Sequence, residues 1–449
     1  MNFEGYSIKK KESQEKDMKV VSFEISDLEE FPKAANLPGS SYYMPHILVL
    51  TKSYTWSNTK YDILSSTESL YKWYKSLVDL SKFNPEALRA LVDRVTAGSK
   101  SDEDKIKAIY YWVQDNIKYI AFEDGLAGFK PEDSDQVYAK KYGDCKGMAN
   151  LTKDMLRIAG FDARLSWIGT DRIAYTYDMP SLAVDNHMIC AVKLNDQFLF
   201  LDATEKHHSI KEYAERLQGK QVLIEDGDSF IIEQIPEEPM GKYLNTTNVS
   251  YSFNDESLNA EVVENIQGEY KRGLINIFEA VPNQKLNLFY KSIAAGNLET
   301  DDVNMLNEPA LKRDSTLELH YNLNMKNHLN KFGNEVYLDL DYKKDLKNSE
   351  IEEDRKVPFK FSTKINRKLK GELVIPEGLA VSHLPEAYQV SSDYFEFNLS
   401  YEVIGNKINY TKELRVLKTY MPVDQFPDWN KAISNVTKFY NDQIILTSK

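Results

Sequence analysis

The order of helical and strand-like patterns in the middle of the chain is the feature that most limits its fold. Between about residues 54 and 234, amphipathic helical patterns begin after Asn84, Ser101 and Asp144. Helices followed by sequential strands are typical of the α+β class, so we predict helices packed on an antiparallel sheet. The strand-like runs come later in the chain, at residues 163–168, 187–194, 197–202 and 221–224.

The chain has 449 residues, enough for about two to four domains. Residues 1–52 hold one or two strands and a proline-containing connector. They cannot bury a core alone, so we interpret them as the remnant of a preceding β domain that packs against the rest. Residues 53–235 are the predicted α+β domain, and the acidic segment 233–241 is typical of a linker. Residues 242–449 form a predicted β-rich, sandwich-like domain. It includes two helical segments, residues 283–295 and 426–441.

Composition excludes several kinds of function. The 56 Lys and Arg against 69 Asp and Glu give a net charge of −13, which leaves no cationic surplus for binding nucleic acid. The longest nearly uncharged apolar run, residues 43–50, is far shorter than the roughly 18 residues that cross a bilayer, so we expect no membrane span. The polar N-terminus contains no signal-peptide core. Cys145 and Cys190 are too few for a disulfide scaffold.

Cys145 is placed for nucleophilic chemistry by the helix that it opens. Asp144 is a suitable N-cap, which puts the thiol in the first turn, at the positive end of the helix dipole. This position favours the thiolate, and Lys146 adds positive charge. At about 100° per residue, Cys145 shares a helix face with Ala149 and Thr152. We therefore expect it to face the core side, as a nucleophile in the floor of a cleft does.

A β-hairpin places His187 beside Asp202. With Asn195 and Asp196 as the turn, paired residue numbers sum to 391. His187 then lies opposite Thr204 and diagonal to Asp202. Because residues 202 and 204 share a strand face, the Cβ atoms of both lie roughly 5.5 to 8 Å from that of His187. A carboxylate beside an imidazole fixes its tautomer and stabilises the imidazolium, which is what a cysteine nucleophile requires of its base.

Each of these residues also has a simpler alternative role. Taken singly, Cys145 is more often a structural cysteine, His187 a buried histidine with satisfied hydrogen bonds, and Asp202 a turn residue at a strand end. The functional interpretation is preferred because the three local contexts agree. Cys190 points to the opposite face of its strand, and we predict that it belongs to the core.

The adjacent histidines His207 and His208 do not make a predicted metal site. Neighbouring residues on a strand point to opposite faces, and no array of cysteines or carboxylates completes a tetrahedral set. We therefore predict no metal and no cofactor. Residues 125–128 contain two glycines but lack the spacing and the lysine of a phosphate-binding loop, so we interpret them as a loop over the cleft.

Three stretches carry these candidate residues: YGDCKGMANLTKDMLRIAGFDARL, then DNHM at the start of a strand, then FLFLDAT. Together they resemble the core of the transglutaminase-like superfamily, in its bacterial multidomain branch with flanking β-rich domains. The similarity covers roughly residues 55–235 and has the order Cys, His, Asp. It implies a papain-like fold in which Cys145 is the nucleophile, His187 the general base and Asp202 the residue that orients the base.

Two details of the resemblance stay open. Members of this branch more often have an acidic residue after the Cys-Lys pair, where this chain has Gly147; the difference concerns local substrate contacts rather than the triad. Acyl chemistry needs two donors at the developing oxyanion, and the backbone N–H of Cys145 supplies one. Family transglutaminases add an aromatic donor, for which Tyr119 is the nearest candidate. The alternative for Tyr119 is a core aromatic residue at a helix end.

The predicted function is cysteine-dependent amide-bond acyl chemistry through a thioester, with a peptide or protein as substrate. We favour hydrolysis over cross-linking because the sequence shows no amine-binding site and hydrolysis needs none. The alternative is a binding or scaffold protein that keeps the fold without catalysis, since fold does not guarantee function. The C-terminal β domain is a candidate to bind a protein or glycan partner. A periplasmic or otherwise exported location is implied by the resemblance alone.

Overall fold

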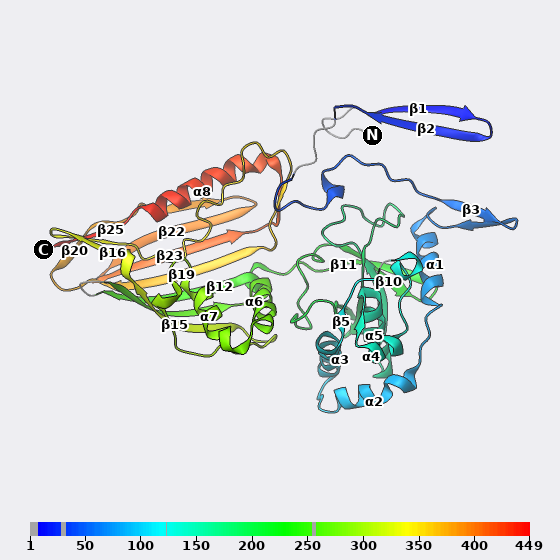
Figure 1. Cartoon of the computed structure of the whole chain (residues 1–449), viewed down its shortest axis with the longest axis horizontal. Coiled ribbons are helices and arrows are strands. Elements are labelled where there is room, and N and C mark those ends of the chain that lie inside the picture. Colours follow the sequence, from blue (N-terminus) through cyan, green and yellow to red (C-terminus); the bar gives the residue numbers. More distant parts are fainter. Residues whose placement is uncertain (1–7, 28–32, 123, 254–256) are drawn as a thin grey trace.

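The computed structural model describes residues 8–27, 33–122, 124–253 and 257–449. Figure 1 shows a central domain with helices α1–α5, a larger body of long strands that includes helix α8, and an N-terminal extension. The α+β class and the β-rich C-terminal region are confirmed. The predicted domain boundaries stay a prediction. In the described part of the chain, no helix is long and apolar enough to span a membrane.

Five helices precede the main sheet of the central domain. Ser101 accepts a hydrogen bond from the backbone N–H of Asp104, and Asp144 accepts one from that of Gly147, so both N-caps form where the sequence has suitable side chains. The first helix has no predicted counterpart because its capping box uses a serine at the third position instead of the usual Glu or Gln. The helices are α1 (Thr67–Val78), α2 (Pro85–Thr96), α3 (Asp102–Asn116), α4 (Ser134–Lys140) and α5 (Cys145–Ile158), with a 3-10 turn at Gly125–Gly128.

The sheet of the central domain is fully antiparallel, in the order β11-β10-β7-β8-β9. The predicted hairpin register is confirmed: Leu194 pairs with Gln197, across a turn in which Asn195 and Asp196 have positive φ. Cys190 is fully buried with apolar residues of α5, also as predicted. The strands are β7 (Ala163–Ile168), β8 (His187–Leu194), β9 (Gln197–Leu201), β10 (Gln221–Asp226) and β11 (Ser229–Gln234).

The C-terminal region is built on an eight-stranded sheet in the order β14-β15-β13-β12-β19-β23-β22-β21, with β12 and β19 parallel and the other neighbours antiparallel. Trp429 of α8 packs on Phe395 and Phe397 of this sheet, so the helix covers one of its faces. The finer expectation of a β-sandwich stays a prediction. The strands are β12 (Leu244–Phe253), β13 (Leu258–Ile266), β14 (Val303–Met305), β15 (Leu317–Met325), β19 (Ile365–Val374), β21 (Tyr388–Ser391), β22 (Phe395–Ile404) and β23 (Lys407–Val416).

Smaller elements complete this region. A four-stranded sheet has the order β16-β17-β25-β20, and β18 pairs with β24. Helices α7 and α8 fall within the two predicted helical segments, whereas α6 was not foreseen. The bounds are β16 (Leu329–Phe332), β17 (Glu335–Leu338), β18 (Phe359–Lys360), β20 (Leu379–His383), β24 (Tyr420–Met421), β25 (Ile444–Ser448), α6 (Gly268–Ala280), α7 (Leu286–Ala295) and α8 (Phe426–Asn441).

The segment between the two regions is fixed in place and is not a loose linker. Ile235 is fully buried, and its backbone N–H donates to the carbonyl oxygen of Lys220. The carboxylate of Glu238 accepts a hydrogen bond from the backbone N–H of Tyr213. These contacts tie the segment to the central domain before the chain enters β12.

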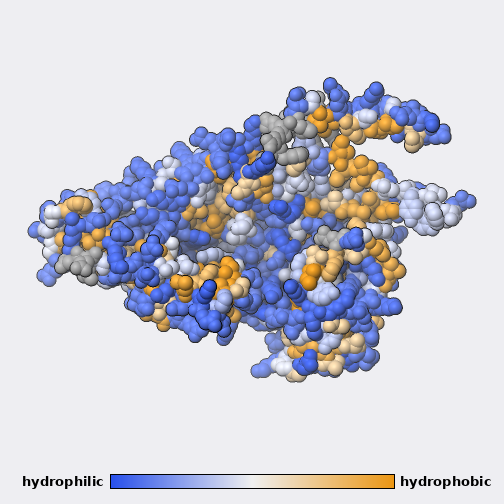
Figure 2. Space-filling model, in the orientation of Figure 1, coloured by the Kyte–Doolittle hydropathy of each residue, from blue (hydrophilic) through white to orange (hydrophobic). Residues whose placement is uncertain are grey.

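The connector and the hairpin of β1 (Ile8–Glu15) and β2 (Met18–Ile25) in the N-terminal segment differ in how they pack. The connector packs against both regions, as predicted: Arg355 donates to the carbonyl oxygens of Ala35 and Asn36, and Ser41 donates to that of Arg172. The prediction of packing against the rest is wrong for the β1–β2 hairpin. The two strands hydrogen-bond to each other, so the backbone groups between them need no other partner. The hairpin projects from the molecule with exposed hydrophobic residues (Figures 1 and 2). A second hairpin, β3 (Ser53–Trp56) and β4 (Thr59–Asp62), leads to α1.

Candidate active site

Cys145 is the first residue of α5 and is partly exposed. Its thiol lies beside His187 on the wall of one cavity and contributes to raising the pKa of that imidazole. The expected contribution of Lys146 is corrected by the structure: its ammonium lies 2.5 Å from the Asp144 carboxylate, and both side chains are buried. Because the N-cap carboxylate compensates this charge, the helix dipole and His187 are the positive influences that remain at the thiol.

His187 and Asp202 meet at the end of the hairpin. Nε2 of His187 lies 2.8 Å from Oδ2 of Asp202, and the two side chains are 5% and 7% exposed. The strand ladder ends at the pair Cys190 and Leu201, so the predicted pairing of His187 with Thr204 does not form. Instead, the hydroxyl and backbone N–H of Thr204 donate to Oδ1 of Asp202, at 2.7 and 3.2 Å. These bonds fix the carboxylate and leave Oδ2 for the imidazole.

The electrostatics of this pair favour a charged imidazole. Burial disfavours the imidazolium, but the Asp202 carboxylate outweighs this effect and raises the pKa of His187 to about 9. Burial likewise opposes the charged carboxylate, while His187 and Arg216 hold the pKa of Asp202 well below its usual range. Since Nε2 is bound to Asp202, Nδ1 is the ring nitrogen left for the thiol.

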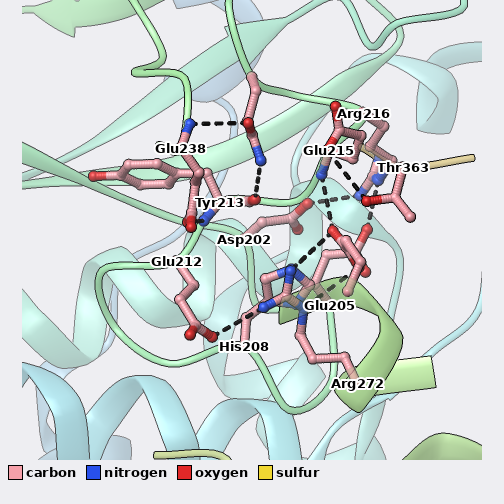
Figure 3. Close-up of polar contacts among 12 residues, drawn as sticks. Asp202, Glu205, His208, Glu212, Tyr213, Glu215, Arg216, Glu238, Arg272 and Thr363 are labelled. Carbon is pink, nitrogen blue, oxygen red and sulfur yellow. Dashed lines mark hydrogen bonds and ion pairs between the residues drawn. The ribbon is translucent and has the colours of Figure 1, made fainter. Parts of the chain in front are cut away.

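Arg216 is a residue of this site that the sequence did not reveal. Its Nη2 lies 2.6 Å from Oδ2 of Asp202, 3.1 Å from Nε2 of His187 and 3.3 Å from the hydroxyl of Thr204. Its Nε donates to Glu205 at 2.5 Å. Figure 3 shows Arg216 beside Asp202 and Glu205. The guanidinium therefore shares the carboxylate oxygen that His187 uses, and its charge lowers the pKa of His187.

The loop that follows Asp202 is bound to helix α6 of the C-terminal region (Figure 3). Arg272 of α6 forms an ion pair of 3.0 Å with Glu212, and Glu269 of α6 lies 3.6 Å from Nε2 of His208. His207 contacts Glu279 at 3.2 Å. Both histidines thus face single carboxylates, and the described residues contain no group of three or more metal ligands.

Two further predicted features lie close to Cys145. Tyr119 is on β5 (Lys118–Tyr119), which pairs in parallel with β6 (Tyr142–Gly143), so Tyr119 is paired with Gly143. The role of Tyr119 in an oxyanion hole stays a prediction. At Gly147, a Cβ atom would lie 3.0 Å from Cγ2 of Val137. An acidic side chain at position 147 would therefore need Val137 to move.

A cavity of about 260 Å³ adjoins the thiol. Gly128 and Phe129 border it, which places the end of the predicted loop at the cleft. Apolar and aromatic groups form most of its walls, with one carboxylate among them. The lining residues are Tyr74, Gly128, Phe129, Cys145, Lys146, Trp167, Asp185, Asn186, His187 and Met188.

Comparison with known families identifies two parts of the chain. Residues 89–203 match the model of the transglutaminase-like superfamily, a segment that contains Cys145, His187 and Asp202. Residues 334–446 match a domain of unknown function, DUF3858. A search of curated proteins found no match.

Two solved structures are similar to the chain. A "putative protease" from Parabacteroides distasonis aligns with a TM-score of 0.54 and 12% identity, over 98% of this chain and 68% of that one. A "putative cysteine protease" from Cytophaga hutchinsonii aligns with a TM-score of 0.22 and 18% identity, over 27% of this chain and 37% of that one. The first similarity shows a shared fold.

Proposed function

We propose that the chain is a cysteine-dependent hydrolase of peptide or side-chain amides, because residues 89–203 match the transglutaminase-like superfamily. The observation that carries this proposal is the hydrogen bond of His187 to Asp202 beside the thiol of Cys145. A cysteine, a base and a carboxylate that orients the base are the groups that nucleophilic acyl transfer requires.

The proposed reaction has two stages. The Cys145 thiolate attacks the amide carbonyl carbon, and the backbone N–H of Cys145 donates to the developing oxyanion. His187 then gives its proton to the leaving amine, and the C–N bond breaks to leave a thioester on Cys145. In the second stage His187 takes a proton from water, the hydroxide attacks the thioester, and the carboxylic acid leaves as the thiol is restored. Asp202 keeps the imidazole oriented and compensates its charge throughout.

Water is the proposed acceptor rather than a second amine. The cavity of about 260 Å³ beside Cys145 has room for one small group. Cross-linking needs a second bound amine as well as the acyl substrate, whereas water reaches a partly exposed thiol without a binding site.

The pH dependence of thiol reactivity tests the proposal. We expect iodoacetamide to alkylate Cys145 at neutral pH in the wild type, because an imidazolium at His187 stabilises the thiolate. In His187→Ala, alkylation should become rapid only near pH 8.5, the ordinary pKa of a cysteine. The measurement is the rate of modification against pH, followed by mass spectrometry of the peptide.

Cys190 is the internal control for that experiment. It is fully buried, and burial raises the pKa of its thiol to about 12, so it should stay unmodified in both proteins. If the two pH profiles of Cys145 coincide with a rise only near pH 8.5, the thiol is not activated. The chain would then be a binding or scaffold protein that keeps the fold without catalysis.

Arg216 gives a second pH prediction. Its charge lowers the pKa of His187, so Arg216→Gln should raise that pKa and extend the imidazolium to higher pH. The alkaline limb of the pH–rate profile for amide hydrolysis, where His187 loses the proton that the leaving amine needs, should move to higher pH. Arg216→Lys keeps a positive charge and should hold the limb near its wild-type position. A limb that moves to lower pH in Arg216→Gln would contradict this role.

A further inference from the structure

The cavity beside Cys145 contains a carboxylate that the proposed reaction does not use. Asp185 lies two residues before His187 and lines the same cavity. The hydroxyl of Tyr74 donates to it, at 2.8 Å from Oδ2 and 3.1 Å from Oδ1. The hydroxyl of Tyr177 lies 3.1 Å from Oδ2 and 2.8 Å from the carbonyl oxygen of Trp167. Two phenols from different segments therefore hold this carboxylate in one orientation at the cavity wall.

Asp185 has neutral partners only. Among the residues described, no ion pair includes Asp185, and its hydrogen-bond partners are the two phenols. The cationic groups that border the cavity have other partners: Lys146 is paired with Asp144, and His187 with Asp202. A largely buried carboxylate without a cation is electrostatically unfavourable. Consistent with this, burial raises the pKa of Asp185 to about 7, although both phenols lower it.

Apart from Asn186 and the ion-paired Lys146 and His187, the remaining walls of the cavity are largely apolar or aromatic. Trp167 and Met188 are buried residues that line it, and Phe129 borders its mouth with a ring that is 37% exposed. Tyr74 stacks on Trp167 with ring centroids 5.0 Å apart, which makes this wall rigid. Apolar and aromatic walls beside a carboxylate, with the neighbouring Lys146 and His187 already paired to other carboxylates, fit an aliphatic group that ends in a positive charge.

We propose that this cavity is a subsite for a primary ammonium group of the acyl substrate, close to the amide that Cys145 attacks. This inference rests on the proposed function and names its substrate class: peptides with a free α-amino group or a lysine side chain at that place. The ammonium would donate to Asp185 and supply the charge partner that the carboxylate lacks. An α-amino group and a lysine side chain both present a primary ammonium, so the experiment must distinguish between them.

Electrophilic substrate analogues test the subsite directly. In a chloromethyl ketone, the Cys145 thiolate attacks the methylene carbon and chloride leaves, which forms a thioether. Two matched pairs differ in one positive charge: alanyl chloromethyl ketone against its N-acetyl form, and Nα-acetyl-lysyl against Nα-acetyl-norleucyl chloromethyl ketone. In the wild type we expect the cationic member of one pair to modify Cys145 at least about tenfold faster than its neutral partner. The pair that responds identifies the source of the ammonium group.

Asp185→Asn is the decisive variant because it removes the charge and keeps the size of the side chain. The preference for the cationic reagent should fall to about onefold, while the rate with the neutral reagent stays near the wild-type value and shows that the site is intact. Asp178→Asn is the matched control, since Asp178 is an exposed residue of the same loop and the net charge changes equally. It should keep the wild-type preference.

The pH dependence of the preference in the wild type gives a second test that needs no variant. The groups that face Asp185 are Tyr74 from α1, Tyr177 from the preceding loop, His187 on β8 and the Lys146 ion pair at the start of α5. As pH rises from about 6 to about 7.5, Asp185 ionises and the cationic preference should grow, because the lysyl ammonium stays charged over this range.

Each result has a defined meaning. Equal rates within both pairs, or a preference that survives in Asp185→Asn, would overturn the ammonium subsite and leave the proposed hydrolase standing. A Cys145 that reacts with none of the four reagents at neutral pH would overturn the proposed function, and the subsite with it.

Discussion

Replacing Cys145 by alanine is expected to abolish amide hydrolysis, with a loss of about a thousandfold or more. The reason is that, of the two described cysteines, Cys190 is fully buried, and Cys145 is the one that lines a cavity together with His187. Removal of a nucleophile from a catalytic triad costs roughly a factor of a million in a well-studied protease, so a thousandfold is a conservative expectation. Release of amine from a library of peptide amides, quantified by mass spectrometry, measures the effect.

Two further variants serve as controls for Cys145→Ala. Cys145→Ser keeps the size of the side chain and a hydroxyl nucleophile, and it should also lose most of the activity because a hydroxyl ionises far less readily than a thiol. Cys190→Ala, in the core, should keep the catalytic activity even if stability falls. Retention of hydrolysis in Cys145→Ala, with the thermal unfolding curve unchanged, would exclude the thioester route.

Replacing Lys412 by methionine should destabilise the C-terminal region by about 3 to 5 kcal/mol. Lys412 lies on β23, is 1% exposed, and places its ammonium 2.7 Å from Asp341 and 2.9 Å from Asp345. Burial opposes the charge of Lys412, but these two carboxylates raise its pKa. Without the ammonium, two buried carboxylates face each other with weaker compensation, and unpaired buried charge is costly. Urea denaturation followed by circular dichroism gives the free energy of unfolding.

Lys407→Met is the matched control, because Lys407 lies on the same strand but pairs with Glu372 at the surface, where both side chains are more than 40% exposed. An exposed ion pair of this kind contributes about 0 to 1 kcal/mol. The Lys412 variant should therefore unfold at clearly lower urea concentration than the Lys407 variant. Equal stability of the two variants would contradict this expectation. It would mean that the negative charge of Asp341 and Asp345 is neutralised in another way, such as by protonation.

Local sequence signals were sufficient for the framework of the site. The N-cap at Asp144 depends on one side chain and one nearby backbone N–H, so the start of α5 and the place of Cys145 follow from adjacent residues. The hairpin register depends on a two-residue turn and on the alternation of side chains along β8 and β9, which brings His187 to Asp202. Both rules depend on residues that are close together in the sequence.

Contacts between segments that are far apart in the sequence could not be predicted from local patterns. Arg216 reaches Asp202 from an irregular loop, where no period relates residue number to direction. The parallel pairing of β12 with β19 joins strands more than a hundred residues apart. The hydrogen bond of Asp185 to Tyr74 likewise joins the loop before β8 to helix α1, more than a hundred residues earlier.

The sequence by itself thus determined the α+β order of the chain, the place of Cys145 at the start of α5 and the hairpin that brings His187 to Asp202. Tertiary structure alone decided the charge environment of these residues: Lys146 is compensated by Asp144, Arg216 shares the carboxylate of Asp202, and Asp185 lies in the cavity without a cation. The physical reason is range. Secondary structure and turns are fixed by neighbours in sequence, whereas the field at a buried group is the sum over all charges that folding brings near it.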